Sequence, residues 1–146
     1  MQNSKETRSL NGITNVLATD VKSTRILTVG GLLVCTKTRS KMTSDLNGSV
    51  TVSSTLVEVD TQTGATAGSL SNIYLDGVFG ETIPDGTLIR LITVPTVVYI
   101  TLNETGNIVK GTNDAIEIRD ENFSNFIWVS STQKWVRCSG TECCIC

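Results

Sequence analysis

The chain has 146 residues, of which 12 are Lys or Arg, 14 are Asp or Glu and none is His, so its formal net charge is −2. Without histidine the commonest general base is missing, and a Ser-His-Asp or Cys-His nucleophile system is excluded within this chain. We therefore expect no enzymatic activity and no cofactor. The basic residues are scattered rather than gathered on a face, so we expect no nucleic-acid partner.

The N-terminal part of the chain, residues 1–26, is expected to form an arm and a first strand region. Its first nine residues are polar and lack the apolar core of a secretory signal. The longest apolar runs, such as 91–94, are far too short to cross a bilayer. We therefore expect a soluble protein that is made in the cytoplasm and does not insert into a membrane. The next apolar run, 27–35, contains Gly30 and Gly31, which indicate a bulge, a tight bend or a close approach between neighbouring chains.

Residues 27–137 have the pattern of an all-β domain. Thr, Val and Ile are abundant, and these β-branched residues favour strands. Asn47-Gly48 is a hairpin signal because both residues tolerate positive φ. Turn signals recur about every ten residues, which is typical of a sandwich, a jelly roll or a barrel. The strands expected in this domain are 50–60, 83–92, 97–102, 115–119, 126–130 and 133–137.

The second half of the domain resembles a known family. The segments IPDGTLIRLI, VVYITLNETGNI, DAIEIRDE and FIWVSSTQKWV are similar to a β-rich domain found at the distal ends of phage fibres and in surface or minor capsid proteins of large DNA viruses. The resemblance covers roughly residues 70–137, and residues 27–32 look like fibre-shaft sequence. The Cys-rich tail, residues 138–146, departs from this pattern.

The resemblance implies an antiparallel jelly roll or sandwich that is often a homotrimer, with apolar residues on the threefold axis. It implies a structural role in a virion: cementing a capsid lattice, decorating it, or displaying a receptor-binding head. The expected partners are like subunits, other capsid proteins and, for a head domain, a host glycan.

The strands supply more apolar positions than one face of a sheet would use, so some are expected at a subunit interface. Substituting one of them, as in Ile118→Asp, is expected to abolish the oligomer, whereas changes in the loop 62–69 are not. The interface candidates are Leu91, Ile92, Val97, Val98, Ile116 and Ile118.

Four of the five cysteines lie in the last nine residues, and two hypotheses compete for them. A disulfide within the tail or between subunits is expected if the mature particle leaves the cell. A zinc site is the weaker alternative, because the second paired motif is missing and no His is available. Cys35 follows an apolar run and is expected to be a small core residue or the leftover thiol. The candidates in the tail are Cys138, Cys143, Cys144 and Cys146.

Trp128 and Trp135 flank an expected terminal hairpin around residues 130–133. An exposed pair of indoles would stack on sugars, so the alternative function is a glycan- or receptor-binding β-sandwich module. The other interpretation places both rings in the core, as is usual for Trp in strands. The carboxylates show no calcium-loop spacing and are expected to be surface charges.

Overall fold

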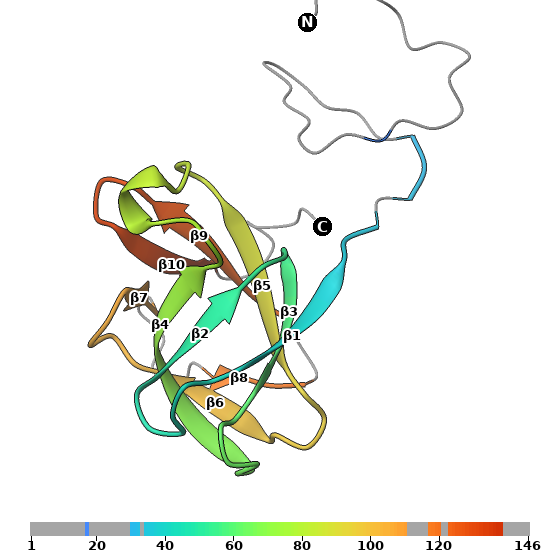
Figure 1. Ribbon diagram of the computed structural model, residues 1–146, viewed down its shortest axis with the longest axis vertical. Helices are drawn as coiled ribbons and strands as arrows, with labels where there is room; N and C mark the ends of the chain where they lie inside the picture. Colours follow the sequence, from blue (N-terminus) through green and yellow to red (C-terminus); the bar gives the residue numbers. More distant parts are fainter. Residues whose placement is uncertain (1–16, 18–29, 33, 111–116, 121–122, 139–146) are drawn as a thin grey trace, which may run out of the picture. The chain divides into compact units, whose positions relative to one another are not determined.

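The computed structural model describes residues 17, 30–32, 34–110, 117–120 and 123–138. The chain divides into two units, Met1–Leu32 and Leu33–Cys146. In the first unit the described residues are Leu17 and 30–32, which lie outside regular structure. All the described strands belong to the second unit (Figure 1). The domain limits expected at residues 27 and 137 stay predictions.

The described residues of the second unit form strands, as the composition predicts, and one short 3₁₀ helix. A six-stranded sheet has the order β1-β3-β5-β9-β10-β7, and a four-stranded sheet has the order β2-β4-β6-β8. The elements are β1 (Lys37–Lys41), β2 (Gly48–Val52), β3 (Leu56–Asp60), β4 (Ala67–Leu75), η1 (Gly80–Thr82), β5 (Leu88–Thr93), β6 (Tyr99–Leu102), β7 (Ile108–Val109), β8 (Glu117–Ile118), β9 (Ser124–Val129) and β10 (Lys134–Cys138).

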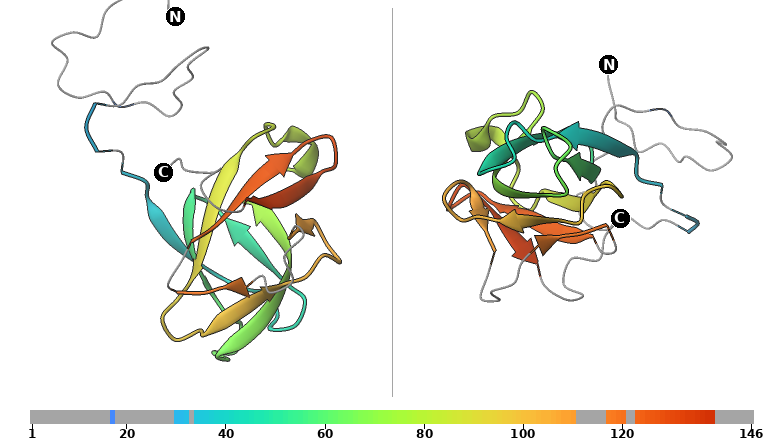
Figure 2. Two further views of the ribbon diagram at one scale, coloured as in Figure 1. Left: turned by 180° about the vertical axis from the view of Figure 1, so that it is seen from behind. Right: turned by 90° about the horizontal axis from the view of Figure 1, so that it is seen from below.

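From β1 to β6 the chain crosses to the other sheet after every strand (Figures 1 and 2). Strands two apart in sequence therefore become neighbours in one sheet. They run in the same direction, because each complete winding brings the chain back to the same side. The parallel pairs formed in this way are β1 with β3, β3 with β5, β2 with β4 and β4 with β6.

Alternating side chains from both sheets form one core. In β3, Val57 and Val59 are buried while their neighbours are half-buried, and β5 and β9 show the same period of two. This is the pattern of strands with one face on a core and one face towards solvent. The four-stranded sheet contributes residues such as Leu70 and Ile100. The all-β class expected from the sequence is therefore confirmed.

The antiparallel pairing expected from the sequence is wrong, because both sheets are mixed. The hairpin expected at Asn47-Gly48 is also wrong: Asn47 has the expected positive φ of 50°, but β1 and β2, on either side of it, lie in different sheets. The turn carries the chain across to the second sheet instead of back along the first. The terminal hairpin is confirmed, since β9 and β10 pair antiparallel with Lys134 opposite Val129. A sandwich or jelly-roll arrangement stays a prediction.

A turn takes the place of a strand along half of β4. β6 pairs only with Ala67–Leu70, which leaves the second half of β4 without a strand on that side. There the Asn107 side chain acts like a peptide group. Its Oδ1 accepts a hydrogen bond from the Ile73 N–H (2.9 Å), and its Nδ2 donates to the Ile73 carbonyl (2.8 Å). The Asn107 N–H donates to Asn72 Oδ1 (3.0 Å), so the turn is held at several points.

The six-stranded sheet also contacts β4 at Ile73. Trp135 of β10 donates its indole N–H to the Ile73 carbonyl (3.1 Å), and its backbone N–H donates to the Asn107 carbonyl (2.7 Å). The turn approaches β4 so closely that a Cβ on Gly106 would collide with the Ser71 carbonyl oxygen. Glycine at this position is therefore required by the contact.

A second polar contact holds the β1–β2 turn against the β3–β4 loop. The Asp45 carboxylate accepts hydrogen bonds from the Thr63 hydroxyl and from the backbone N–H groups of Gln62 (2.7 Å) and Thr63 (3.4 Å). These bonds hold the pKa of Asp45 below its ordinary value of 3.8, and the bond from the Thr63 side chain has the largest effect. Hydrogen bonds to a carboxylate favour its charged form.

Replacing Asn107 by alanine is expected to lower the free energy of unfolding by about 1–3 kcal/mol, because it leaves the Ile73 N–H without its acceptor. Denaturant unfolding followed by tryptophan fluorescence measures the change. Thr96→Ala, at an exposed turn residue, is the control and should change the free energy by less than about 0.5 kcal/mol. Equal losses in the two variants would contradict the role of Asn107.

For Asp45 the expected effect depends on pH. A carboxyl with a lowered folded-state pKa contributes stability above its unfolded-state pKa, and this contribution is lost as the pH falls through the folded-state pKa. Asp45→Asn should therefore be less stable than wild type at about pH 7, and the difference should shrink at about pH 2. Denaturant midpoints at both pH values measure it, with Asp76→Asn as the exposed-carboxylate control. A difference that stays constant with pH would refute the assignment.

Candidate functional site

The interface candidates from the sequence fall into different environments. Leu91, Val97 and Ile118 are buried in the core of the second unit, so they cannot also form a subunit interface. This part of the prediction is wrong because these side chains point between the sheets, towards the core. Ile92 is half-buried and Val98 is 53% exposed, so Val98 is the candidate that solvent reaches most freely. Ile116 lies outside the described residues.

Trp128 and Trp135 are core residues, at 2% and 0% exposure. Their ring centroids lie 5.1 Å apart with an interplanar angle of 60°. The two residues are directly paired across β9 and β10, which places both rings on the inner face of the sheet. Their ring faces are therefore closed to a sugar, and the second of the two interpretations, core packing, is the one that the structure supports.

The cysteines are described in part. Cys35, just before β1, is half-buried, and Cys138 is the last residue of β10. Both are disulfide-bonded, so the expectation that Cys35 is the leftover thiol is wrong, while the pairing of the cysteines stays a prediction. Cys143, Cys144 and Cys146 lie outside the described residues. Within the described parts of the chain, no three His, Cys, Asp or Glu side chains gather in a group that could hold a metal ion, and the weaker zinc hypothesis also remains a prediction.

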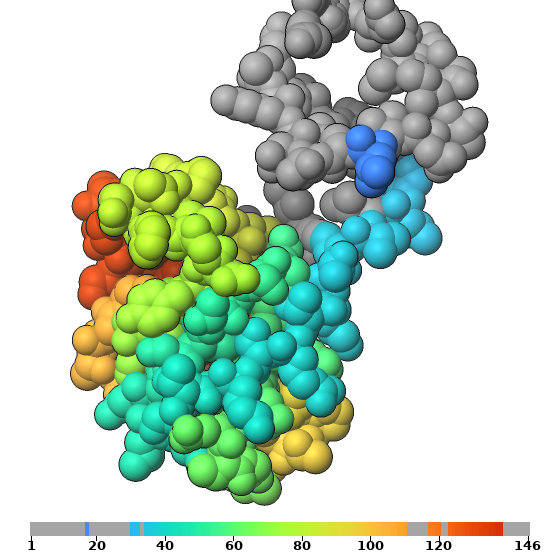
Figure 3. All heavy atoms as spheres, in the orientation of Figure 1, coloured from blue at the N-terminus to red at the C-terminus, as the bar shows by residue number. Residues whose placement is uncertain are grey.

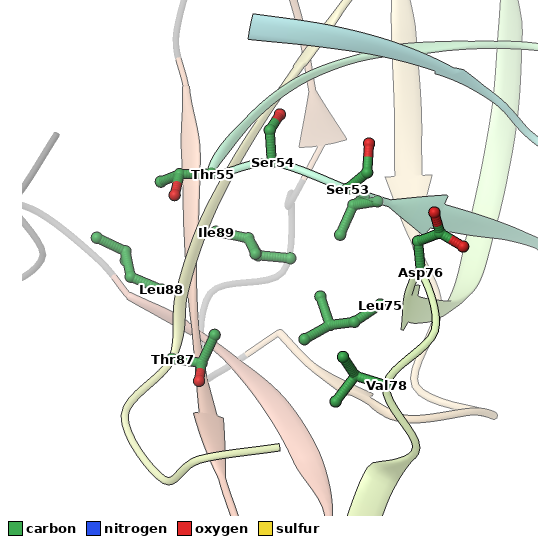
Figure 4. A pocket seen from close by; sticks show the side chains of 10 residues that line it. Ser53, Ser54, Thr55, Leu75, Asp76, Val78, Thr87, Leu88 and Ile89 are labelled. Carbon is green, nitrogen blue, oxygen red and sulfur yellow. The ribbon is translucent and has the colours of Figure 1, made fainter. Parts of the chain in front are cut away.

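A cavity of about 240 Å³ opens where the ends of β2 and β4 meet the start of β5. Figure 4 shows the side chains of Leu75, Val78, Leu88 and Ile89 around the same space. We call this cavity the socket and define it by its apolar lining. The apolar residues that line the socket are Val52, Leu75, Val78, Leu88 and Ile89.

The rim of the socket is polar (Figure 4). Ser53, Thr55 and Asp76 stand at the rim, and Asp76 is the one charged residue among those that line the cavity. The Ser54 hydroxyl is already used, since it donates to the Leu56 carbonyl (2.8 Å). The Thr87 hydroxyl likewise donates to the Pro84 carbonyl (2.7 Å). The volume is below the range of about 300–1,000 Å³ typical of drug-sized ligands. An apolar interior of this size fits an aliphatic side chain better than a metabolite.

The chain enters the domain beside this rim. The Thr38 hydroxyl, in β1, lies 2.7 Å from the Ser54 hydroxyl, and Lys37 is paired with Leu56. In Figure 3 the cyan atoms of the β1 region lie against the teal atoms of the strands that follow. Just before β1, Val34 is 85% exposed. Val34 therefore lies four residues before Thr38, whose hydroxyl contacts Ser54 at the cavity.

The open edge of the six-stranded sheet is charged. β1 forms this edge and presents Lys37, Arg39 and Lys41 as its exposed residues. Lys37 and Arg39 each lie 3.4 Å from a carboxylate oxygen of Glu58 on β3. Lysine and arginine on an edge strand discourage another strand from adding to it. We therefore expect contacts with other chains to avoid backbone pairing at β1.

The socket was not predicted from the sequence. Its residues come from three separate segments, 52–55, 75–78 and 87–89, and only the fold brings them together. The one signal in the sequence was indirect. The apolar run around Gly30 and Gly31, for which a close approach between chains was one interpretation, leads directly into Val34.

No helix of the described residues is both long and apolar enough to cross a membrane. Comparison of the chain with family models, with curated proteins and with solved structures found no match.

Proposed function

We propose that this chain is a non-enzymatic structural protein that assembles with copies of itself in a virion. The observation that carries the self-assembly part is the combination of an aliphatic side chain, Val34, left 85% exposed and an open cavity with an apolar lining. Single exposed apolar residues are common on protein surfaces. An exposed apolar side chain together with an apolar cavity that could receive it is a more specific feature.

The virion part of the proposal rests on the resemblance of roughly residues 70–137 to fibre and minor capsid domains. The strand-rich domain is compatible with such a role. We propose that the assembly contacts other capsid proteins. We also propose that disulfides in the tail stabilise the assembly outside the cell.

Binding of a glycan is a second candidate function, with different residues from those expected. Tyr74 is 49% exposed and Phe79 is 74% exposed, and both are close in sequence to Asp76 at the socket rim. Exposed aromatic rings beside a carboxylate are suited to stacking on a sugar and hydrogen bonding to its hydroxyls. In this case Tyr74→Ala and Phe79→Ala should abolish retention on immobilised glycans, whereas Val98→Ala should not. Unchanged retention in all three variants would exclude these residues as the glycan site.

Self-assembly predicts a concentration-dependent mass in sedimentation equilibrium, rising from one chain to a closed oligomer of two or three chains. A Thr66→Ala change in the exposed β3–β4 loop should leave that mass unchanged. Ile118→Asp now has a different expected result. Because Ile118 is fully buried, the charge should unfold the domain rather than release folded monomers, and circular dichroism distinguishes the two outcomes. A wild-type chain that stays monomeric at every concentration would contradict the proposed function.

A further inference from the structure

We propose that a disulfide joins Cys35, just before β1, to one of the last three cysteines of the chain, and that this bond holds β1 on the domain. We call this disulfide the clasp. A second disulfide joins Cys138 to another of the three. They are Cys143, Cys144 and Cys146, which lie outside the described residues. The inference does not depend on the proposed self-assembly.

The first observation is that both described cysteines are bonded. Cys35 and Cys138 each take part in a disulfide, and the chain has five cysteines. Cys35 is half-buried, although Val34 and Thr36 on either side of it are exposed. Two arrangements satisfy the bonding. Either Cys35 and Cys138 are bonded to each other, or each is bonded to a cysteine within residues 143–146.

The strand order separates Cys35 from Cys138, because three strands lie between β1 and β10 (Figure 1). One row of paired residues crosses the sheet through Cys138, Asn125, Arg90, Leu56 and Lys37. Neighbouring strands lie about 4.8 Å apart, so the four steps of this row make roughly 19 Å across the sheet. Cys35 is two residues before Lys37, which is at most about 7 Å of chain. The Cα atoms of a disulfide lie within about 7 Å of each other, which is too short for this crossing.

The outer face of the sheet between the two cysteines is also occupied. In β9 the residues on both sides of Asn125 are buried, so Asn125 points away from the core. Cys138 is its partner in β10 and therefore shares this outer face. Asn125 Oδ1 accepts a hydrogen bond from Arg90 Nε (2.8 Å). A direct bond from Cys138 to Cys35 would have to pass over this pair of side chains.

The chain that follows Cys138 is long enough for the crossing. An extended residue spans about 3.3–3.6 Å, so the five to eight residues from Cys138 to positions 143–146 reach roughly 16–29 Å. Such a reach matches the width of the row, about 19 Å. Cys35 and Cys138 therefore each take one partner among the last three cysteines. The odd number of cysteines leaves one thiol among these three.

The clasp makes the hold on β1 dependent on oxidation. Closing both disulfides turns four thiols into two disulfides. Four protons and four electrons pass to an oxidant such as oxidised glutathione, of which two molecules become four thiols. In the described part of the domain β1 pairs with β3 alone, at the edge of the sheet. The clasp adds a covalent bond directly before this edge strand, so its reduction should loosen β1 before the central strands.

Peptide mapping without reduction tests the pairing. The full chain is oxidised with oxidised glutathione, alkylated, and digested with trypsin and a glutamate-specific protease. The decisive cleavage sites follow Arg25, Lys37, Arg137 and Glu142. They place Cys35 in peptide 26–37, Cys138 in peptide 138–142, and the other three cysteines in peptide 143–146. Mass spectrometry should find peptides 26–37 and 138–142 both joined to 143–146, in a species that reduction separates.

Two other results of the mapping would overturn the pairing. One is peptide 26–37 joined to peptide 138–142, which means a direct bond between Cys35 and Cys138. The other is peptide 26–37 with an alkylated thiol, which means that Cys35 forms no disulfide in solution. Neither result bears on self-assembly, so this inference and the proposed function fail separately.

Hydrogen exchange of two variants tests the hold on β1. In Cys35→Ser the amides of residues 37–41 should exchange about tenfold faster or more than in wild type. Cys138→Ser is the matched control, because it also removes a disulfide but keeps the clasp, so exchange in β1 should stay slow. Amides of β9 should be unchanged in both variants, which shows that both fold. Equal exchange of β1 in wild type and Cys35→Ser would overturn the clasp even where the mapping finds the pairing.

Discussion

The fold of the second unit depends on one junction, at Ile73 of β4. The Ile73 peptide groups bond to the Asn107 side chain and to the Trp135 indole. Asn107 belongs to the turn that follows β6 of the four-stranded sheet, and Trp135 belongs to β10 of the six-stranded sheet. A single stretch of β4 therefore links both sheets by hydrogen bonds made inside the core, where an unpaired peptide group would be costly.

This junction is needed because the chain winds between two sheets. The winding pairs β1, β3 and β5 in one sheet and β2, β4 and β6 in the other, and every one of these pairs is distant in sequence. Where β6 ends, the partner of β4 must come from elsewhere. The Asn107 amide supplies it, and the close approach of Gly106 makes this possible. β9 and β10 then join the six-stranded sheet as a local hairpin beside β5. β7 lies beside β10 at one edge of this sheet, and β1, with its charged residues, forms the other edge.

The sequence predicts part of the strands and little of their pairing, and the reason is physical. The expected strands do not include β1, β4 or β7, and the expected strand 50–60 is two strands, β2 and β3, which lie in different sheets. The alternation of apolar and polar residues in segments such as β3 and β5 indicates that one face of the strand is buried. It does not indicate which strand pairs with it. The Asn47 turn has the same positive φ in a hairpin and in a crossing between sheets, so its residues do not separate the two. The β9–β10 hairpin was predictable because its pairing is decided by the local turn at residues 130–133.

The same limit explains the outcome for the candidate site. Leu91, Val97 and Ile118 were assigned to an interface because an apolar residue in a strand looks alike whether it faces a core or another chain. The fold places them inside. The buried Trp pair was open to two interpretations for the same reason. The socket joins three segments that nothing in the sequence connects. Val34 lies in the apolar run 27–35, for which a close approach between chains was one of three interpretations, and this stays a prediction.

Hydrogen exchange at low and high protein concentration tests the central claim, self-assembly through exposed apolar surface, most directly. The account predicts that the backbone amide of the exposed Val34 and the amides around the socket, at 53–55 and 76–78, exchange more slowly as the concentration rises. Amides in the exposed β3–β4 loop should not change. Exchange at Val34 and around the socket that is the same at every concentration would contradict the account.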